Sequence, residues 1–259
     1  MIDILLKSYW VEKKVYYAFI LGFFFAMIGM GFANIIFSSE PSFPAIFLTT
    51  LAAAPVVIRL ITSEEWEPKF EKIFSRHGKV IETYAYLFFG MATAFALVYA
   101  LAPQTFVDSL FAEQSKKFVF GYFVEPSSTF YAIFINNLGL VFFFFLLSLF
   151  YGSGSIFLLA WNASILGVLW GNILKIALTL SSVRTLLIGT IFPLPYLIPE
   201  VLAYFLAAVA GGMVAINLTK KEKIAIAMID SLIFLFIAIF IIIGAAFIET
   251  YMLNNLAQS

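Results

Sequence analysis

The sequence contains no cysteine and a single histidine, His77. Without cysteine, the chain has no disulfide, no thiol nucleophile and no thiolate ligand for a metal. One histidine cannot supply the pair that an HExxH zinc site needs, nor any other multi-histidine site. We therefore expect no catalytic residues of these kinds, no metal site and no cofactor.

Charged residues are also scarce. They make up 12% of the 259 residues, while 63% are hydrophobic and 32 are phenylalanine. Soluble domains carry about 25% charged residues, and no soluble fold could bury this much apolar surface. Lipid must be the solvent, so the bilayer is the first expected partner. The 15 basic and 15 acidic residues cancel, which excludes the strongly basic footprint of a nucleic-acid-binding protein.

Apolar runs long enough to cross a bilayer, about 20 residues each, recur along the chain. They predict an all-α polytopic protein, multi-pass in the cell membrane, that forms one membrane domain over residues 1–259. The first run is too long for the apolar core of a signal peptide, so we expect a retained anchor. The seven predicted spans are residues 15–37, 44–61, 83–101, 130–151, 156–171, 199–218 and 224–248.

The distribution of lysine and arginine predicts the side of the membrane that each loop occupies. With a cytoplasmic N-terminus and seven alternating spans, eleven of these residues fall in cytoplasmic segments and four on the other side. Cytoplasmic loops carry the excess of positive charge, so we predict an N-in, C-out topology. A full crossing by residues 172–198 would remove most of this bias. We therefore expect that segment to be re-entrant, or folded back on the outer surface, before the sixth span.

Residues 62–77, between the second and third spans, are predicted to form a cytoplasmic amphipathic helix. Thr62 and Glu65 fit a capping box at its start, and Gly78 is placed to end it. Its apolar residues recur at helical spacing, as in a helix that lies at the membrane surface. The segment is either a connector on the lipid headgroups or a docking helix for a partner.

Glu200 is the most informative residue, because acidic side chains are rare and costly inside a membrane. It follows Pro199 at the head of the sixth predicted span, where the helix macrodipole favours a carboxylate. An amide pair in the fourth span enters the membrane from the same side. We expect an intramembrane polar cluster in which a cation pairs with Glu200 and amides lie nearby. Its candidate members are Glu200, Asn136, Asn137, Asn162, Lys175 and Arg184.

Simpler interpretations of the same polar residues stay open. The asparagines could serve only as hydrogen bonds between helices, and Glu200 could serve only as a helix cap or an interfacial ion pair. Asp230, near the start of the last span, is expected to snorkel toward the basic residues 220–223. His77 is expected in a charged loop.

Small residues at helical spacing predict where helices approach closely in lipid. Gly167 and Gly171 belong to such a stripe in the fifth span, and a second stripe starts at Glu200 in the sixth span. We expect these two spans to pack against each other along their stripes. The residues assigned to helix packing are Gly167, Gly171, Ala203, Ala207 and Gly211.

The order of short motifs in the second half of the chain resembles a known family. The motifs are INN at residues 135–137, GSG at 152–154, WNASILG at 161–167, a proline-rich turn, PEVLAY at 199–204 and AGG at 210–212. This order resembles the stage II sporulation protein M family (SpoIIM-like, formerly DUF95) of integral membrane proteins. The family's glutamate carries over as Glu200. The chain has Ala163 where the family has glycine, and Leu197 and Ile198 where it has histidine and glycine.

The resemblance implies a scaffold, since the family's namesake is understood to gather peptidoglycan-degrading enzymes at the membrane of endospore-forming bacteria. Our leading hypothesis is a non-enzymatic scaffold that organises partner proteins, or copies of itself, in the membrane. The alternative is a secondary transporter or channel with a polar site around Glu200, because re-entrant segments and intramembrane carboxylates also build substrate sites. An intramembrane enzyme is the weakest hypothesis, since no second carboxylate or histidine is evident at the level of Glu200.

Overall fold

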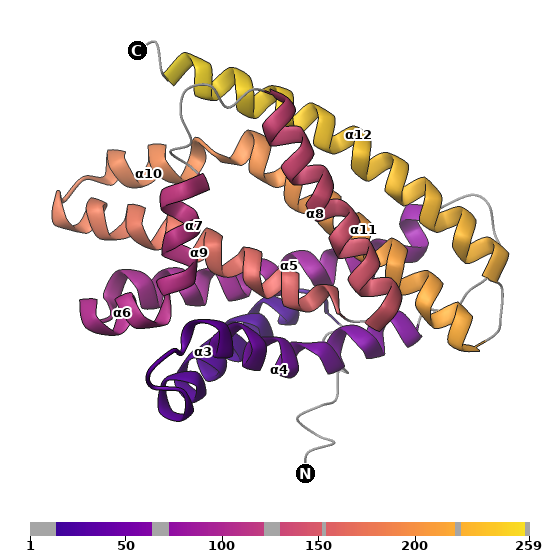
Figure 1. Ribbon diagram of the computed structural model, residues 1–259, viewed down its shortest axis with the longest axis horizontal. Helices are drawn as coiled ribbons and strands as arrows, with labels where there is room; N and C mark the ends of the chain where they lie inside the picture. Colours follow the sequence, from indigo (N-terminus) through magenta and orange to yellow (C-terminus); the bar gives the residue numbers. More distant parts are fainter. Residues whose placement is uncertain (1–13, 64–72, 122–129, 152–153, 221–223, 257–259) are drawn as a thin grey trace. The chain divides into compact units, whose positions relative to one another are not determined.

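Every regular element of the computed structural model is an α-helix, within the residues that it describes: 14–63, 73–121, 130–151, 154–220 and 224–256 (Figure 1). The helices are α3 (Tyr17–Ile36), α4 (Ser42–Ser63), α5 (Ile73–Leu101), α6 (Gln104–Leu110), α7 (Ala112–Gly121), α8 (Phe130–Tyr151), α9 (Ser155–Thr179), α10 (Val183–Ile191), α11 (Leu194–Lys220) and α12 (Ile224–Leu256). Seven of the described helices, namely α3, α4, α5, α8, α9, α11 and α12, are long and apolar enough to cross a membrane. The predicted all-α fold with seven spans is confirmed, while the N-in orientation stays a prediction.

The chain forms helices in these runs because a backbone surrounded by lipid must satisfy its own polar groups. Threonine side chains inside the runs follow the same rule. The hydroxyl of Thr49 donates to the carbonyl of Ala45 at 2.8 Å, and that of Thr93 donates to Phe89 at 2.7 Å. Each threonine thus bonds to the carbonyl four residues earlier, and its hydroxyl adds no unsatisfied group to the apolar surroundings.

The ends of the fifth and sixth spans differ from the prediction. Helix α9 runs for 25 residues to Thr179, whereas the predicted span stopped at residue 171. Segment 172–198 therefore consists of the end of α9, the nine-residue α10 and the start of α11. Ser181, with φ 49°, makes the turn, and the Ser182 side chain caps α10 by accepting from the Thr185 amide. Whether this segment enters the bilayer stays a prediction.

The predicted amphipathic helix at residues 62–77 also has different boundaries. Thr62 continues α4, so it does not cap a new helix, and residues 64–72 lie outside the described part of the chain. Gly78 lies inside α5, which begins at Ile73, and so it does not end a helix. His77 is therefore a residue of a spanning helix, and its side chain is buried. Gly78 was predicted to end a helix, but glycine is tolerated inside a helix that tertiary contacts support.

The chain divides into two compact units, each assembled from three stretches of sequence. Unit 1 comprises Met1–Val56, Tyr86–Phe123 and Ile156–Pro193, and unit 2 comprises Val57–Ala85, Val124–Ser155 and Leu194–Ser259. Unit 1 holds α3, α6, α7, α10 and nearly all of α9, while unit 2 holds α8, α11 and α12. The single domain over residues 1–259 stays a prediction.

Close helix contacts through glycine characterise unit 1. A Cβ added to Gly29 of α3 would lie 2.9 Å from the carbonyl oxygen of Ala45 on α4. A Cβ added to Gly171 of α9 would lie 2.8 Å from the carbonyl oxygen of Ala96 on α5. Such distances are shorter than real Cβ atoms tolerate, so the two backbones meet directly at these positions. Unit 1 is therefore held by packing of backbone on backbone.

The connection that contains α6 and α7 is part of this packing. The Ser42 hydroxyl, at the start of α4, donates to Gln114 Oε1 of α7 at 2.8 Å, and both residues are buried. The ring of Phe111 packs edge-on against Phe95 and Tyr99 of α5. These contacts attach the segment to the helices of unit 1 through both polar and aromatic groups.

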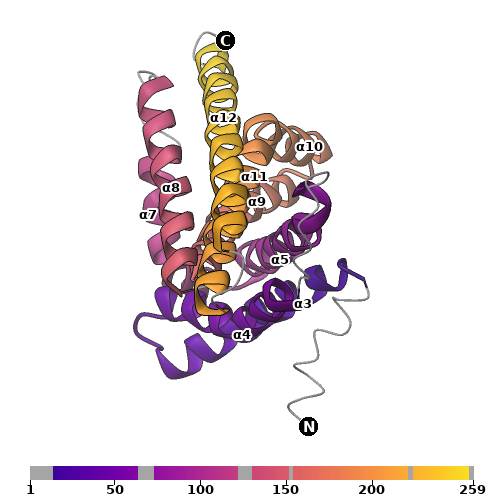
Figure 2. The ribbon, with the colours of Figure 1, turned by 90° about the vertical axis from the view of Figure 1, so that its right-hand side faces the viewer.

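Unit 2 is built around α11, which packs against both α8 and α12. Helices α8 and α11 run in the same direction, because contacts between them keep a nearly constant sequence offset. Asn137 meets Glu200, and the rings of Phe144 and Tyr204 stack at 5.1 Å. Helix α12 runs the opposite way beside α8 (Figure 2), and the Phe247 ring lies 4.2 Å from that of Phe130.

The glycines of the two small-residue stripes meet different helices from those predicted. Gly167 and Gly171 of α9 face α5, where their nearest side chains are Phe95 and Tyr99. Gly211 of α11 faces α8, at the Phe145 carbonyl and the Ser148 side chain. The stripes do mark close contacts, but small residues specify that a helix can approach and not which helix it is.

Substituting Gly211 by alanine should lower the free energy of unfolding by about 1–3 kcal/mol, because the new Cβ would lie 2.8 Å from that of Ser148. Thermal unfolding of the purified protein in detergent, followed by helical circular dichroism, measures this loss. Gly244→Ala is the matched control, since nothing lies within 4 Å of a Cβ at Gly244 of α12. Equal midpoints for the two variants would contradict the close contact between α8 and α11.

Candidate functional site

Three acidic or amide side chains lie at one depth of unit 2. Asn137 follows the start of α8 by seven residues, Glu200 follows the start of α11 by six, and Glu249 precedes the end of α12 by seven. At 1.5 Å per residue, each is about 9–11 Å inside its helix. Because α12 is antiparallel to the other two, all three depths are counted from the same end of the unit.

The Glu200 carboxyl group is joined to α8 by a short hydrogen bond. Asn137 Nδ2 donates to Glu200 Oε1 at 2.6 Å. The oxygen of the same amide accepts from the Tyr204 hydroxyl at 3.0 Å and from Asn136 Nδ2 at 3.2 Å. Tyr204 is four residues after Glu200, so both project from one face of α11 toward Asn137. The amide of Asn137 is thereby fixed in orientation, with its nitrogen toward the acid.

A second carboxyl group completes the cluster from α12. The side chains of Glu200 and Glu249 are within hydrogen-bonding reach of each other. An ionised carboxylate can only accept a hydrogen bond. A hydrogen bond between the two therefore requires that one carboxyl group is protonated, and the pair then holds one proton between two acids.

This acid cluster, which we define as Asn137, Glu200, Tyr204 and Glu249, lies inside the unit. Glu200 is 9% exposed, Asn137 and Tyr204 are buried, and Glu249 is half-buried. An isolated carboxylate in such a place is strongly disfavoured, and partners on neighbouring helices offset that cost. Chemically, the arrangement can do two things. It can link α8, α11 and α12, and it can store or transfer a proton.

Three of the predicted members of the cluster belong to unit 1, whereas Glu200 belongs to unit 2. Lys175 lies on α9 in unit 1, where its ammonium group donates to Gln104 Oε1. Arg184 lies exposed on α10 of unit 1, and Asn162 Nδ2 donates to the Leu158 carbonyl of its own helix at 2.8 Å. Among the described residues of unit 2, no cation pairs with Glu200. Lys175 and Arg184 belong to the other unit, so the pairing of a cation with Glu200 stays a prediction.

The position of Glu200 in its helix also needs correction. Helix α11 begins at Leu194, so Pro199 lies inside it and Glu200 is nearly two turns from its start. The helix macrodipole acts mainly within the first turn. The hydrogen bond from Asn137, and not the end of the helix, is therefore the main support of this carboxyl group.

Sequence reasoning missed Glu249 and Tyr204. The predicted last span stopped at residue 248, one residue before the second acid. No second carboxylate was therefore found at the level of Glu200, and this made an intramembrane enzyme the weakest hypothesis. The structure contradicts that absence. A signal was available, because seven alternating spans bring the end of the last span to the membrane face from which Glu200 enters. Tyr204 could have been found because it lies four residues after Glu200, on the same face of the helix.

A second polar pair lies near the other end of α12. His77 Nε2 of α5 is 3.7 Å from Asp230 Oδ2, and the Phe234 ring meets the imidazole edge-on at 5.6 Å. Both polar side chains are buried. Asp230 therefore approaches α5, and His77 is not in a loop. The predicted snorkelling of Asp230 involves residues 221–223, which lie outside the described part of the chain, so it stays a prediction. Asp230 and Glu249 are 19 residues apart on α12, which is about 28 Å and close to the thickness of the bilayer core.

Comparison with known proteins identifies one family. The family model described as Stage II sporulation protein M matches residues 85–252. No curated protein and no solved structure matches the chain. In the part of the chain that the structure describes, no group of three or more His, Cys, Asp or Glu side chains could hold a metal ion.

Replacing Asn137 by alanine should lower the free energy of unfolding by about 1–2 kcal/mol, because the buried carboxyl group of Glu200 loses its donor. Unfolding in mixed detergent micelles, followed by circular dichroism, measures the change. The neighbouring Asn136→Ala is the control, since Asn136 is exposed and should cost less than about 0.5 kcal/mol. A larger loss at position 136 than at 137 would show that the amide of Asn137 does not support the cluster.

Proposed function

Because the chain belongs to the stage II sporulation protein M family and is a multi-pass membrane protein, we propose that it is a non-enzymatic scaffold that holds partner proteins in the cell membrane. Family membership alone does not assign a function, so the proposal rests on the arrangement of this chain's own side chains.

The burial of Glu200 is the observation that carries the proposal. Glu200 is 9% exposed, and its carboxyl group is engaged by Asn137 of α8 and Glu249 of α12. Its hydrogen-bonding groups are thus directed at neighbouring helices. An internal link of this kind supports a rigid three-helix platform, whereas a substrate site would direct its polar groups into open space.

The outward face of α12 supports the same proposal. Four aromatic side chains on one side of this helix are strongly exposed, and Gly244 lies among them with nothing within 4 Å of a Cβ there. Helices associate in lipid by close packing, and a glycine between large side chains forms a notch that a partner helix can enter. We call this surface the α12 aromatic face; its aromatic members are Phe236, Phe240, Phe247 and Tyr251.

A proton-coupled transporter is the second candidate, and the acid pair is the specific observation in its favour. Glu200 and Glu249 can hold a proton near one end of α12, and Asp230 and His77 lie near the other end. Ionisable residues inside membranes commonly form proton relays in transporters. In this hypothesis, the charge of the pair would change during each transport cycle.

A photo-crosslinking amino acid placed at position 240 should capture a partner's transmembrane helix in native membranes at native expression. Gly244→Ile in the same chain should abolish that crosslink, because the larger side chain fills the notch without touching this chain's own helices. Mass spectrometry of the crosslinked species identifies the partner, and a second copy of the chain would indicate a homo-oligomer. Crosslinks to lipid alone would contradict the scaffold.

Glu200→Gln separates the two candidates. The neutral amide still accepts from Asn137, so a scaffold variant should retain its fold and its crosslink at position 240. The variant cannot release a proton at that position. If wild-type protein in liposomes carries a proton flux that Glu200→Gln abolishes while the crosslink persists, the transport hypothesis replaces the scaffold.

A further inference from the structure

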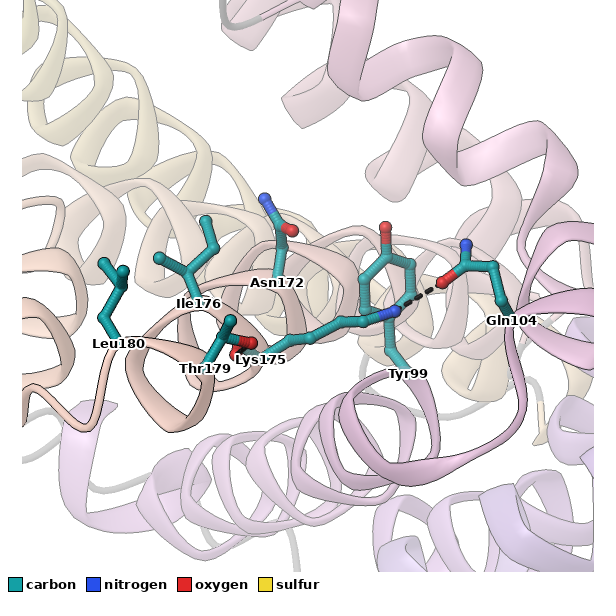
Figure 3. Close-up of a pocket in the computed structure, with 7 residues that line it drawn as sticks. All are labelled: Tyr99, Gln104, Asn172, Lys175, Ile176, Thr179 and Leu180. Carbon is teal, nitrogen blue, oxygen red and sulfur yellow. Dashed lines mark hydrogen bonds between the residues drawn. The ribbon is translucent and has the colours of Figure 1, made fainter.

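A pocket of about 420 Å³ lies in unit 1 and is lined by both polar and aliphatic side chains. Most of its lining comes from one face of α9, because Asn172, Lys175, Ile176 and Thr179 follow the i, i+3, i+4, i+7 spacing of a helix face (Figure 3). The remaining lining residues are Tyr99, Gln104 and Leu180. The pocket combines one cation with amide and hydroxyl groups.

Lys175 crosses this pocket to a neutral partner. Its ammonium group donates to Gln104 Oε1 (Figure 3), and Gln104 Nε2 donates to Asp108 Oδ1 at 2.6 Å. The carboxylate of Asp108 thus orients the Gln104 amide but does not pair with the ammonium group. Among the described residues, Lys175 has no ion pair. An ammonium group has three donors, so two remain for an anion in the pocket.

The depth of the pocket indicates where that anion comes from. The apolar span of α9 ends at Thr179, so Lys175 lies four residues, or about 6 Å, from the end of the span. The side chains of Ile176 and Leu180, which also line the pocket, are exposed, at 42% and 64%. A cation next to exposed aliphatic groups at the end of a span matches the boundary between lipid headgroups and acyl chains.

We propose that this pocket binds the phosphate group of an anionic lipid. Lys175 pairs with the phosphate, Asn172 donates a further hydrogen bond from its amide, and Ile176 and Leu180 contact the acyl chain. Lysine is a common phosphate ligand, and its hydrogen bonds to phosphate oxygens are strengthened by charge. A soluble phosphate ester shares this chemistry, and the experiment below distinguishes the two sources.

Native mass spectrometry of the protein in detergent, titrated with phosphatidylglycerol, tests the proposal. Wild-type protein should retain a bound lipid, and Lys175→Gln should weaken the binding by at least about tenfold, as expected for the loss of a charged hydrogen bond. Lys175→Arg keeps the positive charge and should retain binding. Glycerol phosphate is titrated in parallel, and competition with the lipid would identify the phosphate alone as the recognised group.

Arg184→Gln is the matched control, because it removes one positive charge from the same unit at an exposed position that does not line the pocket. It should change the affinity for the lipid by less than about twofold, which is well below the change expected for the loss of one charged hydrogen bond. Equal weakening by Lys175→Gln and Arg184→Gln would overturn the proposal, since binding would then follow net charge. Undiminished binding by Lys175→Gln would overturn it as well. Binding of lipid but not of glycerol phosphate would support the lipid as the source.

Discussion

An acid inside a lipid-embedded helix bundle must have partners, and the hydrogen bond from Asn137 to Glu200 meets that requirement in this protein. It joins α8 to α11 at one depth. The stacked rings of Phe144 and Tyr204 and the close contact at Gly211 continue the same parallel register along the two helices. Glu249 brings the antiparallel α12 to the same level. The polar interaction thus specifies which helices meet and at what height, whereas apolar surface in lipid specifies neither.

The residues that support the proposed functions lie in both units. In unit 2, the acid cluster is directed inward, and the α12 aromatic face is directed outward, with Gly244 as its notch. In unit 1, the pocket around Lys175 lies where α9 leaves the apolar layer. A scaffold needs a rigid interior in each unit, because that interior keeps the outer surface of the same unit in a fixed position for a helix or a lipid to bind.

The number of spans and the depth of Asn137 could be predicted from the sequence, because hydropathy and residue spacing are local properties of a helix. The depth of Glu200 could not, because α11 begins five residues before the predicted span. The rest depended on tertiary contacts. The fifth span was ended eight residues too early, and Glu249 was missed because the last span was ended one residue before it. The glycines of α9 and α11 were recognised as contact residues, but nothing in their spacing distinguishes α5 from α8 as the partner. His77 was predicted to lie in a loop because charged residues surround it in the sequence, whereas α5 continues through it.

A double-mutant cycle between positions 137 and 200 tests most directly whether this hydrogen bond holds the bundle together. The free energy of unfolding is measured in micelles for the wild type, Asn137→Ala, Glu200→Ala and the double variant. The account predicts a coupling energy of about 0.6–2 kcal/mol between the two side chains. Strictly additive losses, with no coupling, would show that Asn137 and Glu200 do not support each other and would contradict the central role of the acid cluster.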